Sequence, residues 1–329
     1  IGALAGVALT TGGTNTAVGY ESLNSEQAGT KNTALGYQAL KTLSGAGANA
    51  DNVAVGNQSG TAMTTGVANT LVGSLSGDAL TDADHNTAIG VNALTNDTLG
   101  SKSVAVGSLA LAAQNFTTAT DSHNTAVGYS AGTAVTTGQE STMVGSLAGK
   151  ALTAGDKNVA IGTSALQADT LGSKSVAVGR GALGVQNFTT ATDAFNVAIG
   201  DEAGVSITTG IQNTLIGSEC GDALTDADFN VALGRNTLST DTLGSKTTAI
   251  GFQALANQNF TTATDSNNVA VGYNAGVSVT TGTENTLIGA EAGEALTTGE
   301  KNTYVGYGAG HADDLGSRNV GVGRGAFAS

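Results

Sequence analysis

Asn15-Thr16-Ala17-Val18-Gly19 is one copy of a short phrase that this chain repeats, with small changes, from one end to the other. Counted from glycine to glycine, the usual step is about 17 residues, and a step that is wider by a few residues occurs at intervals. A fixed period of this size is typical of a solenoid, in which each repeat packs only against its neighbours. The phrase therefore predicts a stack of coils, one per repeat, rather than a closed globule.

A longer period contains the short one. Three short steps and one wide step make a block of 72, and the segment Gln114–Asp121 accordingly returns at 186–193 and 258–265. We therefore expect one solenoid rod over residues 1–329. Its four-coil blocks are expected at about 56–127, 128–199, 200–271 and 272–329. Both ends of the chain fall inside a repeat, which indicates a segment of a longer fibre.

The alternation within the phrase predicts a β-strand. With the repeat glycine as position 0, Val, Ile or Leu occupies position −1, Thr or Val position −3, and mostly Ala position −2. Residues two apart share one face of a strand, and β-branched residues favour strands. The expected fold class is all-β, a parallel β-solenoid. The bulky face is expected inside each coil, together with leucines at position +4 such as Leu94 and Leu111.

The opposite face would then be a flat ladder of Ala and Gly on the outside of the coils. Small residues let another backbone approach closely. This face is therefore a candidate surface along which identical chains pack around a shared axis. The alternative is that Ala and Gly are simply tolerated beside a tight bend.

Position −4 is Asn in most repeats, and its amide is suited to fixing a turn or to bonding from coil to coil. We predict a structural ladder here. Its members are Asn15, Asn32, Asn52, Asn69, Asn86, Asn124, Asn158, Asn196, Asn213, Asn230, Asn268, Asn285, Asn302 and Asn319.

Composition and charge exclude several classes of protein. With 49 Gly, no Pro, no Trp and 4% aromatic residues, an aromatic-rich globular core is not expected. The net charge of −14 argues against a nucleic-acid or anionic-membrane partner, which needs a basic face. No apolar run reaches the ~20 residues that a membrane span in this segment would need. Cys220 has no disulfide partner in the chain and is interpreted as a small buried residue, the alternative being a reactive thiol.

The phrases Ser103–Gly107, Asn158–Gly162 and Ser175–Gly179 resemble the head repeats of trimeric autotransporter adhesins, typified by the Yersinia adhesin head. They are also similar to repeats in bacteriophage tail-fibre shafts. The resemblance covers nearly the whole chain. It implies a left-handed β-roll, a homotrimer around a common axis and attachment at an extracellular, cell or virion surface. The longer coils and the four-coil block depart from the compact adhesin-head coil, and no neck, stalk or membrane anchor of that family is recognisable.

Catalysis requires a local constellation that a repeat cannot supply at every coil. The histidines His85, His123 and His311 are isolated in the sequence, without metal-ligand spacing, and no nucleophile–base pairing is suggested. We therefore expect no enzyme activity and no cofactor. Calcium in acidic loops is the one exception considered, because hard cations favour carboxylate oxygens. Asp78, Asp82 and Asp84 recur as Asp222, Asp226 and Asp228, and Asp121, Asp193 and Asp265 close the longer loops.

The function expected is that of a structural or adhesive fibre. Its partners would be further copies of itself, as a homotrimer or filament, and a surface receptor or glycan. The candidate contact loops carry Phe116, Phe188 and Phe260, which alternatively cap the roll or clamp neighbouring chains. An ice-binding solenoid would need an uninterrupted Thr array, and a polysaccharide-cleaving tail spike would need paired acids and aromatic platforms. Neither pattern is evident.

Overall fold

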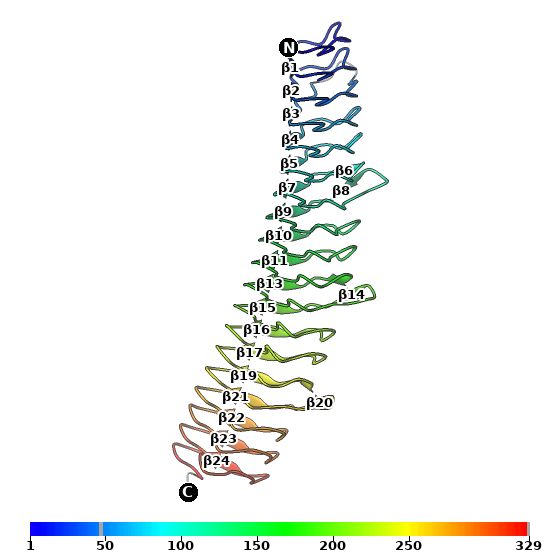
Figure 1. The fold of residues 1–329 in the computed structure, drawn as a ribbon. Helices are drawn as coiled ribbons and strands as arrows, with labels where there is room; N and C mark the ends of the chain where they lie inside the picture. The colour runs from blue at the N-terminus through cyan, green and yellow to red at the C-terminus, as the bar shows by residue number, and fades with distance from the viewer. Residues whose placement is uncertain (46–48, 328–329) are drawn as a thin grey trace. The chain divides into compact units, whose positions relative to one another are not determined.

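The structure is a computed structural model that describes residues 1–45 and 49–327. Residues 328 and 329 of the last expected block therefore lie outside the described part. The fold is an all-β parallel β-solenoid of about 18 coils, with roughly 17 residues per turn and no helix among the described residues (Figure 1). Contacts divide the chain into two compact units, residues 1–158 and 159–329, and each is described by itself.

The first unit contains one short strand in each coil, and each strand pairs in parallel with the next along the chain. The strands are β1 (Thr16–Val18), β2 (Thr33–Leu35), β3 (Val53–Val55), β4 (Thr70–Val72), β5 (Thr87–Ile89), β7 (Val104–Val106), β9 (Thr125–Val127) and β10 (Thr142–Val144). Two further strands, β6 (Gly100–Ser101) and β8 (Thr120–Asp121), pair with each other at the long loop.

The second unit repeats this arrangement. Its coil strands, again paired in parallel and in chain order, are β11 (Val159–Ile161), β13 (Val176–Val178), β15 (Val197–Ile199), β16 (Thr214–Ile216), β17 (Val231–Leu233), β19 (Thr248–Ile250), β21 (Val269–Val271), β22 (Thr286–Ile288), β23 (Thr303–Val305) and β24 (Val320–Val322). The loop strands are β12 (Gly172–Ser173) with β14 (Thr192–Asp193), and β18 (Gly244–Ser245) with β20 (Thr264–Asp265).

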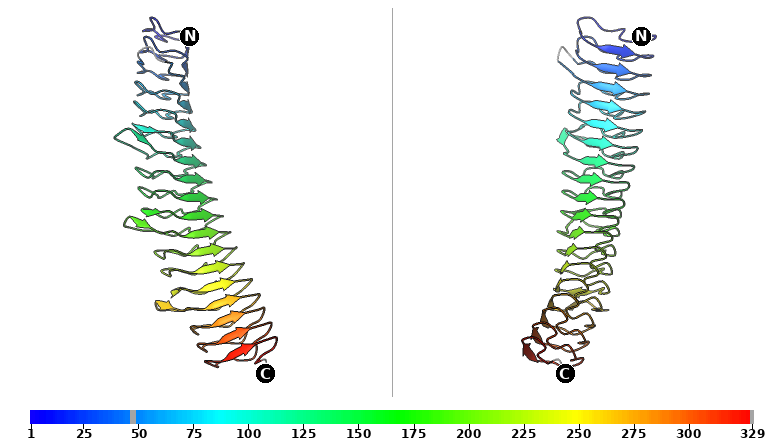
Figure 2. Two further views of the ribbon diagram at one scale, coloured as in Figure 1. Left: turned by 180° about the vertical axis from the view of Figure 1, so that it is seen from behind. Right: turned by 90° about the vertical axis from the view of Figure 1, so that its left-hand side faces the viewer.

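Successive strands pair in strict repeat register, so that each residue meets its own equivalent in the next coil. Thr16 pairs with Thr33 and Val18 with Leu35, for example. Within each unit the coil strands consequently form one parallel sheet, seen as a row of arrows in Figure 2. A one-residue slip would turn every side chain to the other face, so this register keeps each repeat position in a single column.

The faces of the coil strands are reversed from the prediction. Position −2 points inward, and Ala34, Ala88 and Leu71 are all 0% exposed. Positions −3 and −1 point outward, and Leu35 and Ile89 are 44% and 39% exposed. The assignment of the β-branched face to the interior was therefore wrong. The physical reason is the narrow coil, which holds the leucines of position +4 and leaves room for little more than a methyl group opposite them.

Positions −2 and +4 fill the interior together: where the side chain at one position is large, the residue at the other is small. Where +4 is Leu, as at Leu94 and Leu111, the leucine is buried and the nearby position −2 is Ala. Where −2 is Leu71, the neighbouring +4 residues are Gly60 and Gly77, and a Cβ on either glycine would lie 2.8 Å from a Leu71 methyl group. Close packing of this kind makes the core sensitive to single methylene changes.

The repeat glycines are required by the stacking of the coils. Gly73 has φ +140°, and a Cβ there would lie 2.4 Å from the carbonyl oxygen of Gly90 in the next coil. The backbone that approaches the glycine column is therefore the neighbouring coil of the same chain. The prediction of an outer Ala and Gly face that packs against other chains was therefore wrong. The alanines are buried inside the coil, and the glycines contact the next coil of the same chain.

Candidate interaction surface

The outward face of the coil strands carries an aliphatic side chain, Val, Ile or Leu, at position −1 and either Thr or Val at position −3. None of these positions carries a charge. The −1 side chains are half-buried or exposed in both units, with Ile161, Ile199 and Ile288 each 39% exposed. We call these two columns the outer aliphatic face. Contiguous exposed apolar surface of this kind marks an interaction site in soluble proteins.

Aromatic rings border the outer aliphatic face at position +1. Tyr20 and Tyr37 stack at a ring-centroid distance of 5.6 Å, and Phe252 stacks on Tyr273 at the same distance. Each pair joins equivalent positions of adjacent coils, and all four rings are partly exposed. The rings therefore widen the apolar surface of each unit by one column at these coils.

The predicted asparagine column lies inside the coils, buried except at its two end members Asn15 and Asn319. Each typical member makes two hydrogen bonds through its side-chain amide. The backbone nitrogen of Asn86 donates to Oδ1 of Asn69 at 2.9 Å, and Nδ2 of Asn69 donates to the carbonyl oxygen of Ala83 at 2.7 Å. One amide thus satisfies two backbone groups of the following coil, which places these side chains in the architecture and away from any external ligand.

The long loop of the first unit is tied down by a buried carboxylate. Asp97 is 0% exposed, and its Oδ1 accepts hydrogen bonds from the backbone nitrogens of Gly100 and Phe116, both at 3.0 Å. Its Oδ2 accepts a bond from Nε2 of Gln114 at 2.6 Å. Asp169 and Asp241 make the same three contacts in the second unit. Burial raises the pKa of Asp169.

The phenylalanines of these loops do not face solvent. Phe116, Phe188 and Phe260 are only 5–6% exposed. Gly100 leaves room for the first ring, since a Cβ there would lie 2.8 Å from Phe116 Cδ2. The rings are therefore buried in the coil, where they are more stable than in water, and this agrees with the alternative that they cap the roll. Contact of the loops with a partner stays a prediction. The exposed loop tips are Thr117–Ala119, Thr189–Ala191 and Thr261–Ala263.

The candidate calcium carboxylates of the first unit are each engaged by a neighbouring coil, whereas in the second unit Oδ1 of Asp222 is buried without a hydrogen-bond partner. Asp78 accepts a hydrogen bond from the Thr95 hydroxyl at 2.6 Å, Asp82 one from the Thr65 hydroxyl, and Asp84 one from the backbone nitrogen of Val67 at 2.8 Å. Each carboxylate therefore has its own partner, and the three do not converge on one point. The sequence motif corresponds to a ladder between coils.

The loop-closing aspartates form ion pairs with lysines of the preceding coil. Lys102 pairs with Asp121, and the pairs Lys174–Asp193 and Lys246–Asp265 have N–O distances of 2.5 Å. The hydrogen bond from Lys102 lowers the pKa of Asp121. These pairs are about half exposed, and exposed pairs contribute little to stability.

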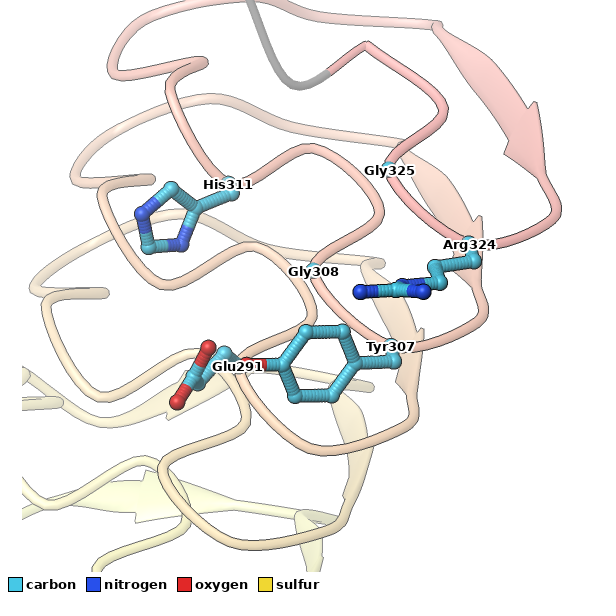
Figure 3. Close-up of a pocket in the computed structure, with 6 residues that line it drawn as sticks. All are labelled: Glu291, Tyr307, Gly308, His311, Arg324 and Gly325. Atoms are coloured by element: carbon cyan, nitrogen blue, oxygen red, sulfur yellow. The ribbon is translucent and has the colours of Figure 1, made fainter.

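The three histidines differ in their surroundings. His85 and His123 are exposed, and each adopts a positive φ. His311 lies 2.8 Å from Glu294, measured from Nδ1 to Oε2. It also lines a cavity of about 230 Å³ together with Glu291, Tyr307 and Arg324, shown in Figure 3. Sequence reasoning missed this group, although His311 and Glu294 occupy the same position of adjacent repeats.

Cys220 lies in the core at a position where most coils have Ala or Ser. Burial raises the pKa of its thiol to about 12. The thiol therefore stays protonated near neutral pH, and a protonated thiol is a poor nucleophile.

Comparison with protein-family models, curated proteins and solved structures finds no match for this chain. None of the described residues forms a helix that is long and apolar enough to cross a membrane.

Proposed function

We propose that this chain is a segment of a structural or adhesive fibre, assembled from several copies of itself and acting outside the cell, at a cell or virion surface. The observation that carries the proposal is the outer aliphatic face, which repeats at every coil of both units without a charged residue at positions −1 and −3. The acidic net charge of −14 lies elsewhere on the coils and keeps the remaining surface soluble.

The partner that fits the outer aliphatic face best is a second copy of the same chain. Parallel strands repeat about every 4.8 Å along the stack, and an identical chain offers apolar side chains at the same spacing. Removing such side chains from water is worth about 25 cal/mol per Å². Closed symmetry is the usual way in which identical chains bury such a face. The number of copies proposed here, three around a common axis, comes from the resemblance to trimeric adhesin heads.

Attachment to a receptor or glycan is assigned to the exposed loop tips. The tip Thr117–Ala119 returns at 189–191 and 261–263, once in every four-coil block. Each tip is held by its buried aspartate anchor and by a lysine–aspartate pair. Several identical tips in one chain, multiplied by the number of copies in the assembly, suit multivalent binding of weak individual affinity.

The mass of the purified chain in solution tests the assembly. We expect light scattering to give three chains per particle. The double variant Ile89→Glu/Val106→Glu buries two carboxylates in the proposed interface and should reduce the particle to one chain. The matched control Thr117→Glu/Thr118→Glu places the same two charges on a loop tip and should leave the mass unchanged. A single-chain mass for the unmodified protein would refute the self-assembly.

Two alternative functions, ice binding and polysaccharide cleavage, can be distinguished from a fibre by experiment. Outward Thr residues at position −3 invite comparison with ice-binding solenoids, but Val53 and Val104 interrupt the column between Thr33 and Thr125. Thermal hysteresis of the purified chain would favour ice binding over a fibre. Release of reducing ends from host glycans would favour a polysaccharide-cleaving tail spike.

A further inference from the structure

Glu291, Glu294 and His311 bring three potential metal ligands together at one end of the second unit. Their ligand atoms all lie within 4.8 Å of one another, and among the described residues this is the one such group. Two of the side chains come from one coil and the third from the next. We propose that these residues form a binding site for a divalent transition-metal ion with the preferences of zinc. This inference is independent of the fibre function.

The stacking of the coils creates the geometry. Glu294 and His311 both stand at position +5 from a repeat glycine, so register places one directly over the other. Their side chains already meet, with Nδ1 of His311 2.8 Å from Oε2 of Glu294. Zinc bonds to nitrogen and oxygen are about 2.0–2.2 Å long, so two ligand atoms of one ion are at most ~4.2 Å apart. Half-exposed glutamates reach that separation by a small side-chain rotation.

The donor set decides which ion fits. One imidazole nitrogen and two carboxylate oxygens match the ligands of zinc sites, whereas calcium requires about six to eight oxygen ligands. The site is therefore distinct from the aspartate ladders that the sequence suggested for calcium.

A cavity beside two of the proposed ligands would give an ion access to the site. The cavity of about 230 Å³ is lined by Glu291 and His311 and bordered by Gly308 and Gly325 (Figure 3). Both glycines stand at position +2 from a repeat glycine, where another coil has Gln253. Since neither has a side chain, the cavity stays open towards Glu291 and His311, the two ligands that line it. A zinc ion with three protein ligands keeps its fourth position for water or an exogenous ligand.

Tyr307 supports the site from outside the ligand set. Its hydrogen bond with Glu291 is the main reason why the pKa of Tyr307 is raised. Outer partners of this kind orient a ligating carboxylate. Arg324, from the next coil, packs over the Tyr307 ring, with its Cζ atom 5.7 Å from the ring centroid.

The preceding four-coil block supplies a natural comparison. Its equivalent positions hold Glu219, Asp222 and Ser239, so two carboxylates remain but the histidine is absent. Asn236 stands where the last block has Gly308. If all three ligands are needed, the preceding block should not bind zinc. The variant His311→Ser should then abolish zinc binding by the last block as well.

Isothermal titration of the full chain with zinc chloride tests the proposal. We expect one ion per chain, with at least tenfold weaker binding in His311→Ser and in the isosteric Glu294→Gln. His123→Ala and Glu219→Gln are the matched controls and should bind within twofold of the unmodified chain. Circular dichroism checks that each variant is folded. Cobalt substitution should give the intense visible bands of a four-coordinate ion, and these should disappear in His311→Ser.

Three results would overturn the site. Failure of the unmodified chain to take up zinc would leave His311 and Glu294 as an ion pair only. An equal loss of affinity in the controls and in the ligand variants would indicate general attraction to an acidic surface. Equal binding by His311→Ser would show that the imidazole is not a ligand. Conversely, Ser239→His with Asn236→Gly should add a second ion per chain.

Discussion

Oδ1 of Asn52 accepts a hydrogen bond from the backbone nitrogen of Asn69 at 2.9 Å, across the boundary between two coils. The same relationship recurs between Asn69 and Asn86, also at 2.9 Å. A buried column of amides thus satisfies backbone groups that the short strands leave without a partner. Unpaired buried polar groups are costly, so this column fixes how each coil sits on the next.

Removing one member of the asparagine column should destabilise the first unit. Asn69→Ala leaves the nitrogen of Asn86 and the carbonyl of Ala83 without these partners, and we expect a loss of about 1–3 kcal/mol in unfolding free energy. Urea denaturation measures it. The control Asn57→Ala removes an exposed amide and should change little. Equal midpoints for the two variants would contradict a structural role for the column.

Adding a methyl group to a repeat glycine should strongly destabilise the folded chain. In Gly73→Ala the Cβ would lie 2.4 Å from the carbonyl oxygen of Gly90, at a φ of +140° that L-residues rarely adopt. We expect a loss of about 3 kcal/mol or more, because the neighbouring backbone must move. Gly13→Ala is the matched control, since no atom lies within 4 Å of its Cβ position. Thermal melts that do not distinguish the two variants would refute this explanation.

The complementary sizes of positions −2 and +4 can be tested by exchanging the large and the small residue. Leu71→Ala should cost about 2–5 kcal/mol, as expected for a cavity in a close-packed core. Gly77→Leu alone should also destabilise, because its side chain meets Leu71 and Leu80. The double variant recreates the arrangement of Ala88 and Leu94 and should be more stable than the sum of the single effects predicts. Strict additivity in a double-mutant cycle would contradict the coupling.

The thiol of Cys220 should be unreactive in the folded chain. Burial raises its pKa to about 12, so the thiolate is scarce near neutral pH. We expect an aromatic disulfide reagent to label it only after denaturant is added. Rapid labelling of the native chain would show that the coil around Cys220 opens readily.

Because of Tyr304, the free energy of unfolding should fall at alkaline pH. Burial first, and then the hydrogen bond with Asp313, raises the pKa of Tyr304 to about 12. The folded state therefore favours the neutral phenol. Its contribution is complete below the ordinary tyrosine pKa of about 10 and is lost as pH rises from there through the folded value. Phenolate absorbance should show this late step, and Tyr304→Phe should remove it. A late step that persists in the variant belongs to another tyrosine.

Much of the fold follows from local pattern. The glycine spacing predicts the coil length, and the alternation ending in Val18 and Gly19 predicts the strand, because strand periodicity and a positive φ are properties of a few consecutive residues. The left-handed turn of the coils stays a prediction. What the alternation does not determine is which of its two faces lies inside.

The sequence by itself thus determined the repeat, the parallel stacking and the positions that form columns. Only the tertiary structure decided that Ala34 faces inward and Leu35 outward, that the ring of Phe116 is buried, and that Glu294 meets His311. These outcomes depend on the width of the closed coil and on contacts between residues a full turn apart. No short window of sequence contains that information.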